Sequence, residues 1–241
     1  MTRTTVFCIV EGQTENAVLK RLLAPHLGQQ GIDLHAPIVR VGRGRGGVRF
    51  LQAEDLYRQI RRCLQDPRLP YVTTFFDYYA FPTSPSKGWE FVAEPKAEAF
   101  FRGAEAVAAS IEQEIHRRAI EGLDLPGVQS RLIPYIQLHE LEALLFAEPD
   151  KTAATFGSAR LATQIAAVVK QCGGCEKIND RPERAPSKRI EALFPGYRKG
   201  RSDLAHAPRV ADRLDLNQVR LACPRFSNWL AKIESLAPQV P

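Results

Sequence analysis

The fold is decided by residues 5–27, TVFCIVEGQTENAVLKRLLAPHL. The first six of these residues form a mainly apolar run rich in β-branched side chains, which predicts a short buried strand. A polar turn follows at 11–14, and from Glu15 onward apolar residues recur at helical spacing. A strand, a tight turn and a helix in this order are typical of the opening of an α/β unit.

The same alternation continues through the first 150 residues. The pattern predicts further strands at 38–41, 71–76 and 131–138, and helices at 50–64, 96–120 and from 140 to 146. Residues 42–47 alternate glycine with arginine and predict a loop. We therefore predict an α/β fold over 1–150, with a mainly parallel sheet flanked by helices, and a helical C-terminal region over 151–241 packed on it.

Composition narrows the class of protein. The chain has 241 residues, of which 44% are hydrophobic and 25% are charged, as in ordinary globular proteins. No apolar run approaches the roughly 20 residues needed to cross a bilayer, and the N-terminus does not resemble a signal peptide, so we expect a cytoplasmic protein without a membrane partner. The net charge of +6 favours a polyanionic partner such as nucleic acid.

Among the five cysteines, only Cys172 and Cys175 form a closely spaced pair. A structural zinc site usually has four ligands, and the chain contains no second pair. The pair therefore favours a tight glycine turn flanked by free thiols.

Basic residues gather in two segments. Arg43 and Arg45 belong to the glycine–arginine stretch, and Lys188 and Arg189 belong to a later basic block. We predict that these four residues contact phosphates of nucleic acid. A solvated, flexible loop is the alternative for the glycine–arginine stretch.

Acidic residues follow the predicted strands. Glu11 comes after the first strand, Asp77 after the strand at 71–76, and Glu140 and Glu142 after the strand at 131–138. Open α/β sheets bind ligands at the carboxyl ends of their strands. Carboxylates gathered there repel one another unless a divalent cation lies among them, and oxygen ligands favour Mg²⁺ or Mn²⁺. The pattern therefore predicts a metal site suited to phosphodiester chemistry.

Each of these residues also has a structural interpretation. Glu15, Glu140 and Glu142 could each stabilise the first turn of a helix, where backbone N–H groups lack partners. Asp77 could simply open a turn. His139 could be a base, a metal ligand or a buried residue whose hydrogen bonds are satisfied.

Several motifs together resemble the DUF4276 family over nearly the whole chain. They are Glu11-Gly-Gln-Thr-Glu15, Asp77-Tyr-Tyr79, Leu138-His-Glu-Leu-Glu-Ala-Leu-Leu-Phe146, Ala185-Pro-Ser-Lys-Arg-Ile190, Phe194-Pro-Gly-Tyr-Arg-Lys199 and Cys223-Pro-Arg-Phe226. This family is similar to the Toprim superfamily and, within it, to the RloB and OLD-type nucleases. Genes of the family often lie beside ATPase genes in prokaryotic anti-phage defence loci.

The resemblance implies a Toprim-like fold with magnesium between a glutamate after the first strand and an Asp-x-Asp motif after a later strand. By position, Glu11 is that glutamate and Asp77 is the first aspartate. The second aspartate falls at Tyr79, which departs from the pattern. OLD-like proteins carry a further glutamate at the start of a later helix, and Glu142 matches it best.

The leading hypothesis is a nuclease that depends on Mg²⁺ or Mn²⁺, acting alone or with a partner ATPase. Glu11, Asp77 and Glu142 would hold the metal, and Glu15 or Glu140 would orient the attacking water or hold a second metal. The first alternative is a non-catalytic Toprim-like module that binds nucleic acid or an ATPase, which Tyr79 favours. The second is action on a small phosphate ester or nucleotide. Homo-oligomerisation is left open.

Overall fold

The structure of the chain, a computed structural model, describes residues 3–41, 44–45, 47–68, 70–81, 88–92, 103–179, 182–198 and 205–238. It divides into two compact units. Unit 1 comprises Met1–Gly12, Gly28–Gln137 and Ala237–Pro241, and unit 2 comprises Gln13–Leu27 and Leu138–Leu236. The domain boundary predicted at residue 150 stays a prediction.

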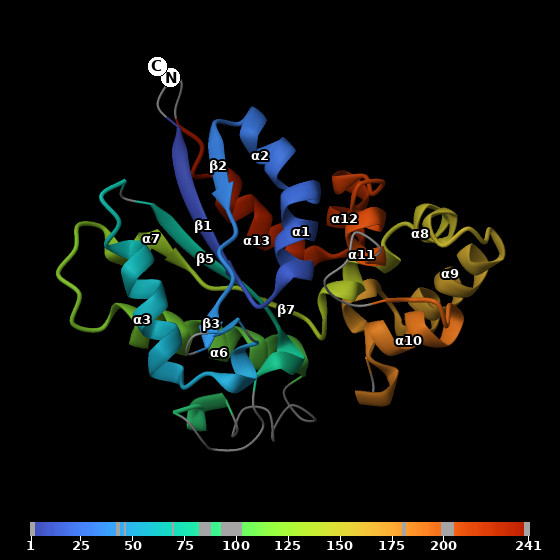
Figure 1. Ribbon diagram of the computed structural model, residues 1–241, viewed down its shortest axis with the longest axis horizontal. Helices are drawn as coiled ribbons and strands as arrows, with labels where there is room; N and C mark the ends of the chain where they lie inside the picture. The colour runs from blue at the N-terminus through green and yellow to red at the C-terminus, as the bar shows by residue number, and fades with distance from the viewer. Residues whose placement is uncertain are drawn as a thin grey trace. The chain divides into compact units, whose positions relative to one another are not determined.

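Unit 1 is built on a five-stranded sheet (Figure 1). Its strands are β1 (Thr4–Val10), β2 (Ile32–His35), β5 (Tyr71–Asp77), β6 (Leu132–Ile133) and β7 (Ile136–Gln137). The order is β2-β1-β5-β6, with β7 also on β5, and every pairing in this sheet is parallel. The predicted α/β fold with a mainly parallel sheet is thus confirmed. The sequence pattern did not predict β2, which is only four residues long.

The two central strands are buried, as the apolar runs at 5–10 and 71–76 predict. Cys8 and Val10 of β1 and Val72 and Phe75 of β5 are fully buried. Strands of parallel sheets are covered on both faces, so their sequences are continuously apolar. This explains why these two strands were easy to locate.

The predicted strand at 131–138 is interrupted. β6 and β7 both pair with β5 but are separated by Pro134 and Tyr135, and Pro134 has no N–H to donate to a neighbouring strand. The hydroxyl of Thr74 on β5 bridges the gap, since it donates to the carbonyl of Tyr135 and accepts from its N–H, both at 2.9 Å. The side chain of Thr74 therefore supplements a long backbone bond from the Phe76 N–H to the Tyr135 carbonyl, at 3.5 Å.

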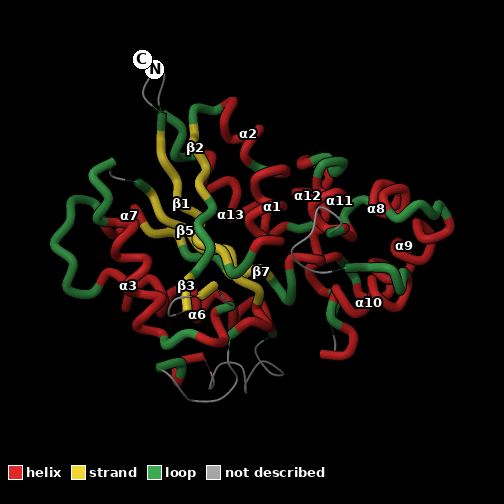
Figure 2. Tube along the Cα trace, viewed as in Figure 1, coloured by secondary structure: helices red, strands yellow, loops and turns green. Residues whose placement is uncertain are grey.

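Among the described residues of unit 1, helices α3 (Ala53–Leu64), α6 (Ala104–Ile120) and α7 (Val128–Arg131) flank the sheet. The buried residues of α3 recur every three or four positions, and α3 packs against α6 and β5. The other two helices pack on the short strands, α6 on β7 and α7 on β6. In Figure 2 these helices are red beside the yellow strands.

The glycine–arginine stretch contains regular structure. β3 (Arg40–Val41) and β4 (Gly44–Arg45) form an antiparallel pair, with Arg40 opposite Arg45 and Val41 opposite Gly44. The prediction of a loop over 42–47 is therefore wrong at Gly44 and Arg45, because backbone pairing with β3 holds them. The described part of unit 1 also contains the 3₁₀ turns η1 (Val48–Phe50) and η2 (Tyr78–Ala80).

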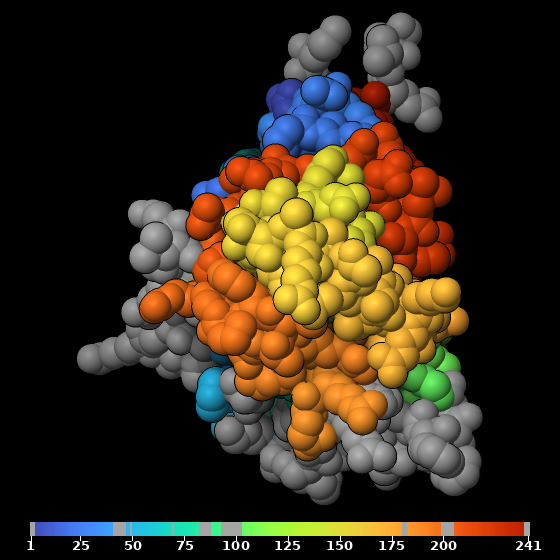
Figure 3. Space-filling model, turned by 90° about the vertical axis from the view of Figure 1, so that its right-hand side faces the viewer, coloured from blue at the N-terminus to red at the C-terminus, as the bar shows by residue number. Residues whose placement is uncertain are grey.

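Unit 2 is helical, as predicted for the C-terminal region. Its elements are α1 (Gln13–Leu22), η3 (Leu141–Phe146), α8 (Pro149–Thr155), α9 (Arg160–Cys172), η4 (Cys175–Lys177), η5 (Pro182–Arg184), α10 (Pro186–Leu193), α11 (His206–Ala211), α12 (Leu216–Ala222) and α13 (Pro224–Glu234). α2 (Ala24–Gln29) begins in unit 2 and ends in unit 1. Figure 3 shows the face of unit 2 that α8, α9 and α10 form.

Helix α1 belongs to unit 2, although it directly follows β1 in the sequence. It packs on α11, where Arg21 forms an ion pair with Asp212. Stacked rings of Phe156 and Phe194, with centroids 4.7 Å apart, join the chain around α8 to the end of α10. Among the described residues, no helix combines the length and apolar character required to cross a membrane.

Arg131 is a buried structural cation that joins three segments of unit 1. It ends α7 and is 7% exposed, and its guanidinium donates to the carbonyl of Leu64 at 2.6 Å and to that of Pro70 at 3.1 Å. Replacement by methionine would leave these carbonyls without their donor. We expect Arg131→Met to lower the free energy of unfolding by about 3 kcal/mol, measured by urea denaturation.

Arg58→Met is the matched control, because the Arg58 side chain is 60% exposed and pairs only with Asp55 of its own helix. Its effect should stay within about 0.5 kcal/mol. Equal stability of the two variants would contradict the structural role of Arg131.

Candidate functional site

Glu11 and Asp77 lie together at the carboxyl ends of neighbouring strands. β1 and β5 pair in register up to Val10 opposite Phe75, and Glu11 follows directly after β1. The Asp77 N–H donates to Glu11 Oε1 over 2.9 Å. Both residues are half-buried, so the carboxylates are held by the sheet and remain accessible to solvent.

Gly47 lies against the other oxygen of Glu11. A Cβ atom at position 47 would lie 2.9 Å from Glu11 Oε2, closer than real Cβ contacts allow. The backbone of Gly47 is extended, with φ of −69°, so a larger residue there would strain no backbone angle but would require the Glu11 carboxylate to shift. The Glu11 carboxylate is thus confined between the end of β5 and the chain just before η1.

Unit 2 contains a second acidic group, centred on Tyr197. Glu142 is fully buried, and its Oε1 accepts the Tyr197 hydroxyl at 3.0 Å. Burial, followed by the negative charges of Glu142, Glu140 and Glu15, raises the pKa of Tyr197 well above its ordinary value. The hydroxyl therefore stays protonated and donates to Glu142, which offsets part of the cost of burying that carboxylate.

Glu140 also stabilises a helix, but not its own. Its Oε2 accepts the backbone N–H of Ser187 at 2.8 Å, in the first turn of α10. A carboxylate at this position satisfies a backbone donor and interacts favourably with the helix dipole. This contact supports a structural role for Glu140, with the Ser187 N–H as its partner.

His139 is a buried neutral residue. It is 5% exposed, has a φ of 64°, and its Nδ1 lies 3.2 Å from the side-chain Nδ2 of Asn179. Burial lowers the pKa of His139 to about 4, against an opposing effect of Glu140. Because the imidazole is buried and bonded, the structure favours the interpretation of a satisfied buried residue.

The predicted basic residues have varied surroundings. Lys188 is exposed and pairs with Glu191 at 2.7 Å, while Arg189 donates to the carbonyl of Arg184 at 3.0 Å. Arg45 lies in β4, and Arg43 falls outside the described residues. Phosphate contacts by these four residues stay a prediction.

The five predicted site carboxylates thus form two groups, one in each unit. Glu11 and Asp77 lie in unit 1, and Glu15, Glu140 and Glu142 lie in unit 2. Across the described part of the chain, no three His, Cys, Asp or Glu side chains are grouped closely enough to hold a metal ion by themselves. None of the five cysteines forms a disulfide, and all five lie within the described residues.

The sequence did not identify Gly47 or Tyr197 as part of either acidic group. Tyr197 lies in the Phe194–Lys199 motif that carried the family resemblance, so a signal for it was present. Gly47 is one of four glycines in its stretch, and nothing in the sequence distinguishes it from the others. Its role depends on a contact with a residue 36 positions away.

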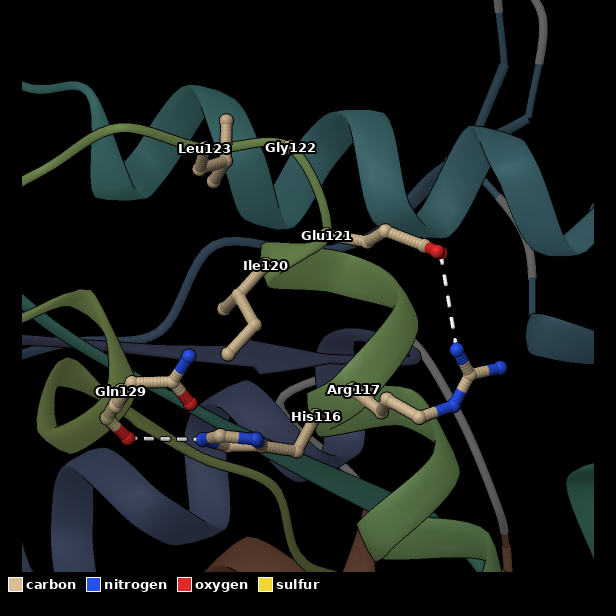
Figure 4. A pocket seen from close by; sticks show the side chains of 7 residues that line it. All are labelled: His116, Arg117, Ile120, Glu121, Gly122, Leu123 and Gln129. Carbon is tan, nitrogen blue, oxygen red and sulfur yellow. Dashed lines mark hydrogen bonds and ion pairs between the residues drawn. The ribbon is translucent and has the colours of Figure 1, made fainter.

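Unit 1 also has a separate pocket of about 410 Å³ at the C-terminal end of α6 (Figure 4). His116 Nε2 is bonded to the carbonyl of Gln129 at 2.8 Å on one side of it. On the other side, Arg117 lies 3.8 Å from Glu121. Because these polar groups already pair with each other, we place the candidate site at the strand ends instead.

The parallel sheet and its strand-end carboxylates define an α/β protein with an acidic candidate site. The model of the family described as "Domain of unknown function (DUF4276)" matches residues 10–234, so the chain belongs to this family. No curated protein and no solved structure matches the chain.

The buried His139 makes stability depend on pH. Its folded pKa of about 4 lies below the ordinary value of 6.5, so the unfolded chain binds the proton first as the pH falls. Stability from this residue is complete above pH 6.5 and is lost progressively toward pH 4. We expect wild type to lose about 2 kcal/mol more than His139→Asn between pH 7 and pH 5, measured by urea denaturation.

Asparagine suits this comparison because it does not titrate and tolerates a positive φ. The difference in unfolding free energy between wild type and His139→Asn reports the effect of His139, because carboxylates titrate in both proteins and cancel. Parallel loss of stability in the two proteins would contradict the assignment.

Proposed function

We propose that this chain is a magnesium-dependent nuclease whose metal is held at the carboxyl edge of the unit 1 sheet. The observation that carries the proposal is the confinement of Glu11 between the Asp77 N–H and Gly47. A carboxylate held in one orientation beside a second carboxylate at strand ends is suited to metal binding.

The donors at this edge fit a hard divalent cation. Glu11 and Asp77 offer only oxygen atoms, and both are half-buried. Magnesium is commonly held by one or two protein carboxylates together with water and substrate phosphates, so two carboxylates are sufficient. That Glu142 is a third ligand stays a prediction from the sequence.

The roles of the protein residues follow from their positions. Glu11 and Asp77 would hold the metal, and the arginines of the β3–β4 hairpin would bind the phosphates of the substrate. When bound, magnesium supplies polarisation of the scissile phosphate and a lower pKa for the attacking water. Orientation of that water by Glu15 or Glu140 stays a prediction.

The finer assignment rests on resemblance. A sheet with parallel pairing, a glutamate after β1 and an aspartate as the last residue of β5 agrees with a Toprim-like protein related to RloB and OLD-type nucleases. Anti-phage defence and a partner ATPase belong to the same proposal. Mn²⁺ would serve in place of Mg²⁺, since both prefer oxygen ligands.

Glu11→Gln tests the proposal directly. The amide keeps the shape of the side chain but removes its charge, so we expect magnesium-dependent cleavage of DNA or RNA to fall at least about a hundredfold. The assay compares labelled single-stranded and duplex DNA and RNA. Glu121→Gln is the control, because Glu121 is 68% exposed and lies at the end of α6. Equal cleavage by Glu11→Gln and wild type would exclude Glu11 from the mechanism.

Gly47→Ala probes the orientation of Glu11 without changing its charge. The added methyl group must displace the carboxylate from its position near residue 47. We expect cleavage to fall about tenfold or more, while the midpoint of thermal unfolding changes little, because the displaced atom ends a flexible side chain. Gly28→Ala is the control. A Cβ atom added at Gly28 would have the Arg3 guanidinium as its nearest neighbour, at an ordinary contact distance of 3.8 Å. Unchanged cleavage by Gly47→Ala would show that Glu11 needs no such confinement.

A second candidate function is a non-catalytic module that binds nucleic acid or an ATPase. The observation that favours it is Tyr79, which occupies the position of the second aspartate and lies in η2 with its ring centroid 6.0 Å from that of Tyr78. Calorimetric titration with magnesium and manganese separates the two candidates. Binding of either metal that Glu11→Gln abolishes supports the nuclease, and no binding supports the module.

A further inference from the structure

Phe50 is an exposed aromatic residue on a well-anchored turn. It is 56% exposed, whereas Val48 and Leu51 on either side are 0% and 1% exposed. Only Phe50 and Leu221 are exposed large hydrophobic residues among those that the structure describes. More than half of the Phe50 surface is therefore accessible to a binding partner.

Hydrogen bonds of the turn hold the backbone of Phe50 in place. The N–H of Phe50 bonds to the carbonyl of Gly47, and the N–H of Leu51 to that of Val48, both at 3.0 Å. The Trp89 indole N–H donates to the Leu51 carbonyl at 2.9 Å, and Trp89 is fully buried. The exposure of Phe50 is therefore a property of a fixed element.

Phe50 lies close to the candidate site along the chain. Gly47, which contacts the Glu11 carboxylate, begins the same turn. The β3–β4 hairpin precedes it and places two arginines, Arg40 and Arg45, opposite each other in register. This segment thus combines positive charge, an exposed ring and proximity to Glu11.

The hairpin is itself fixed to α3. The side chain of Gln59 accepts the N–H of Arg40 at 2.8 Å and donates to its carbonyl at 3.1 Å. Arg40 is exposed, so its guanidinium faces solvent beside an anchored backbone. A fixed basic strand is able to bind phosphates at little cost in conformational entropy.

We propose that Phe50 stacks on an unpaired base of single-stranded nucleic acid, with Arg40 at a flanking phosphate. Base stacking on an exposed aromatic residue beside a basic surface is the usual way in which proteins bind single strands without sequence preference. Bases inside a duplex are already stacked, so Phe50 selects single strands. This inference rests on the proposed function and names its substrate class.

Fluorescence anisotropy tests the inference with a labelled single strand of about 12 nucleotides and a duplex of the same sequence. EDTA is present, so that nothing is cleaved. We expect Phe50→Ala to raise the Kd for the single strand about tenfold and the Kd for the duplex less than about twofold. Phe50→Trp should bind the single strand as wild type does because indole also stacks. Phe50→Leu should bind it as weakly as Phe50→Ala because leucine lacks a ring.

Leu221→Ala is the matched control, since Leu221 is 76% exposed and lies on α12 of unit 2. It should bind the single strand as wild type does. Equal loss of single-strand and duplex affinity in Phe50→Ala, or full binding by Phe50→Leu, overturns stacking as the role of this ring.

The two proposals fail in different ways. If Phe50→Ala binds the single strand as wild type does while cleavage still requires Glu11, the stacking role is overturned and the nuclease proposal is unaffected. Single-strand binding that depends on Phe50, in a protein that cleaves nothing, supports the stacking role and overturns the nuclease.

Discussion

The parallel pairing of β1 with β5 is the constraint on which the candidate site depends. It runs in register from Val6 opposite Tyr71 to Val10 opposite Phe75. Both strands end at the same edge, and one hydrogen bond from the Asp77 N–H then fixes the first carboxylate after β1. A shift of one residue would exchange the β1 side chains between the two buried faces of the sheet and disrupt their packing, so the core sets this register. The same burial that stabilises the sheet therefore positions Glu11.

In unit 2, buried carboxylates act in a different way. Glu142 is bonded to Tyr197, and Glu176 accepts the N–H groups of Arg225 and Phe226 at the start of α13, both at 2.9 Å. Glu140 does the same at the start of α10. Each carboxylate thus satisfies donors that would otherwise be costly to bury. Acidic residues in one short stretch of sequence therefore serve the packing of helices that come much later in the chain.

The basic hairpin shows how short elements gain definition from their neighbours. Each of its strands is only two residues long, and two such strands would not be stable alone. Gln59 of α3 supplies two further hydrogen bonds to the backbone of Arg40, and the buried Val48 anchors the chain that follows. A stretch whose composition predicts a loop thereby contains ordered backbone beside the strand-end carboxylates.

The sequence by itself determined the α/β class, the strands β1 and β5, and the position of Glu11 and Asp77 at their ends. It could do so because buried parallel strands are continuous apolar runs, and a carboxylate after such a run is conspicuous. The sequence pattern predicted one strand at 131–138, and only the structure showed its interruption at Pro134 and the bonds of Thr74 across the gap. Only the tertiary structure decided that α1 groups with unit 2, that Glu140 caps α10 and that Gly47 confines Glu11. These features join residues that are far apart in the chain, and local sequence patterns carry no information about which distant backbone a side chain will meet.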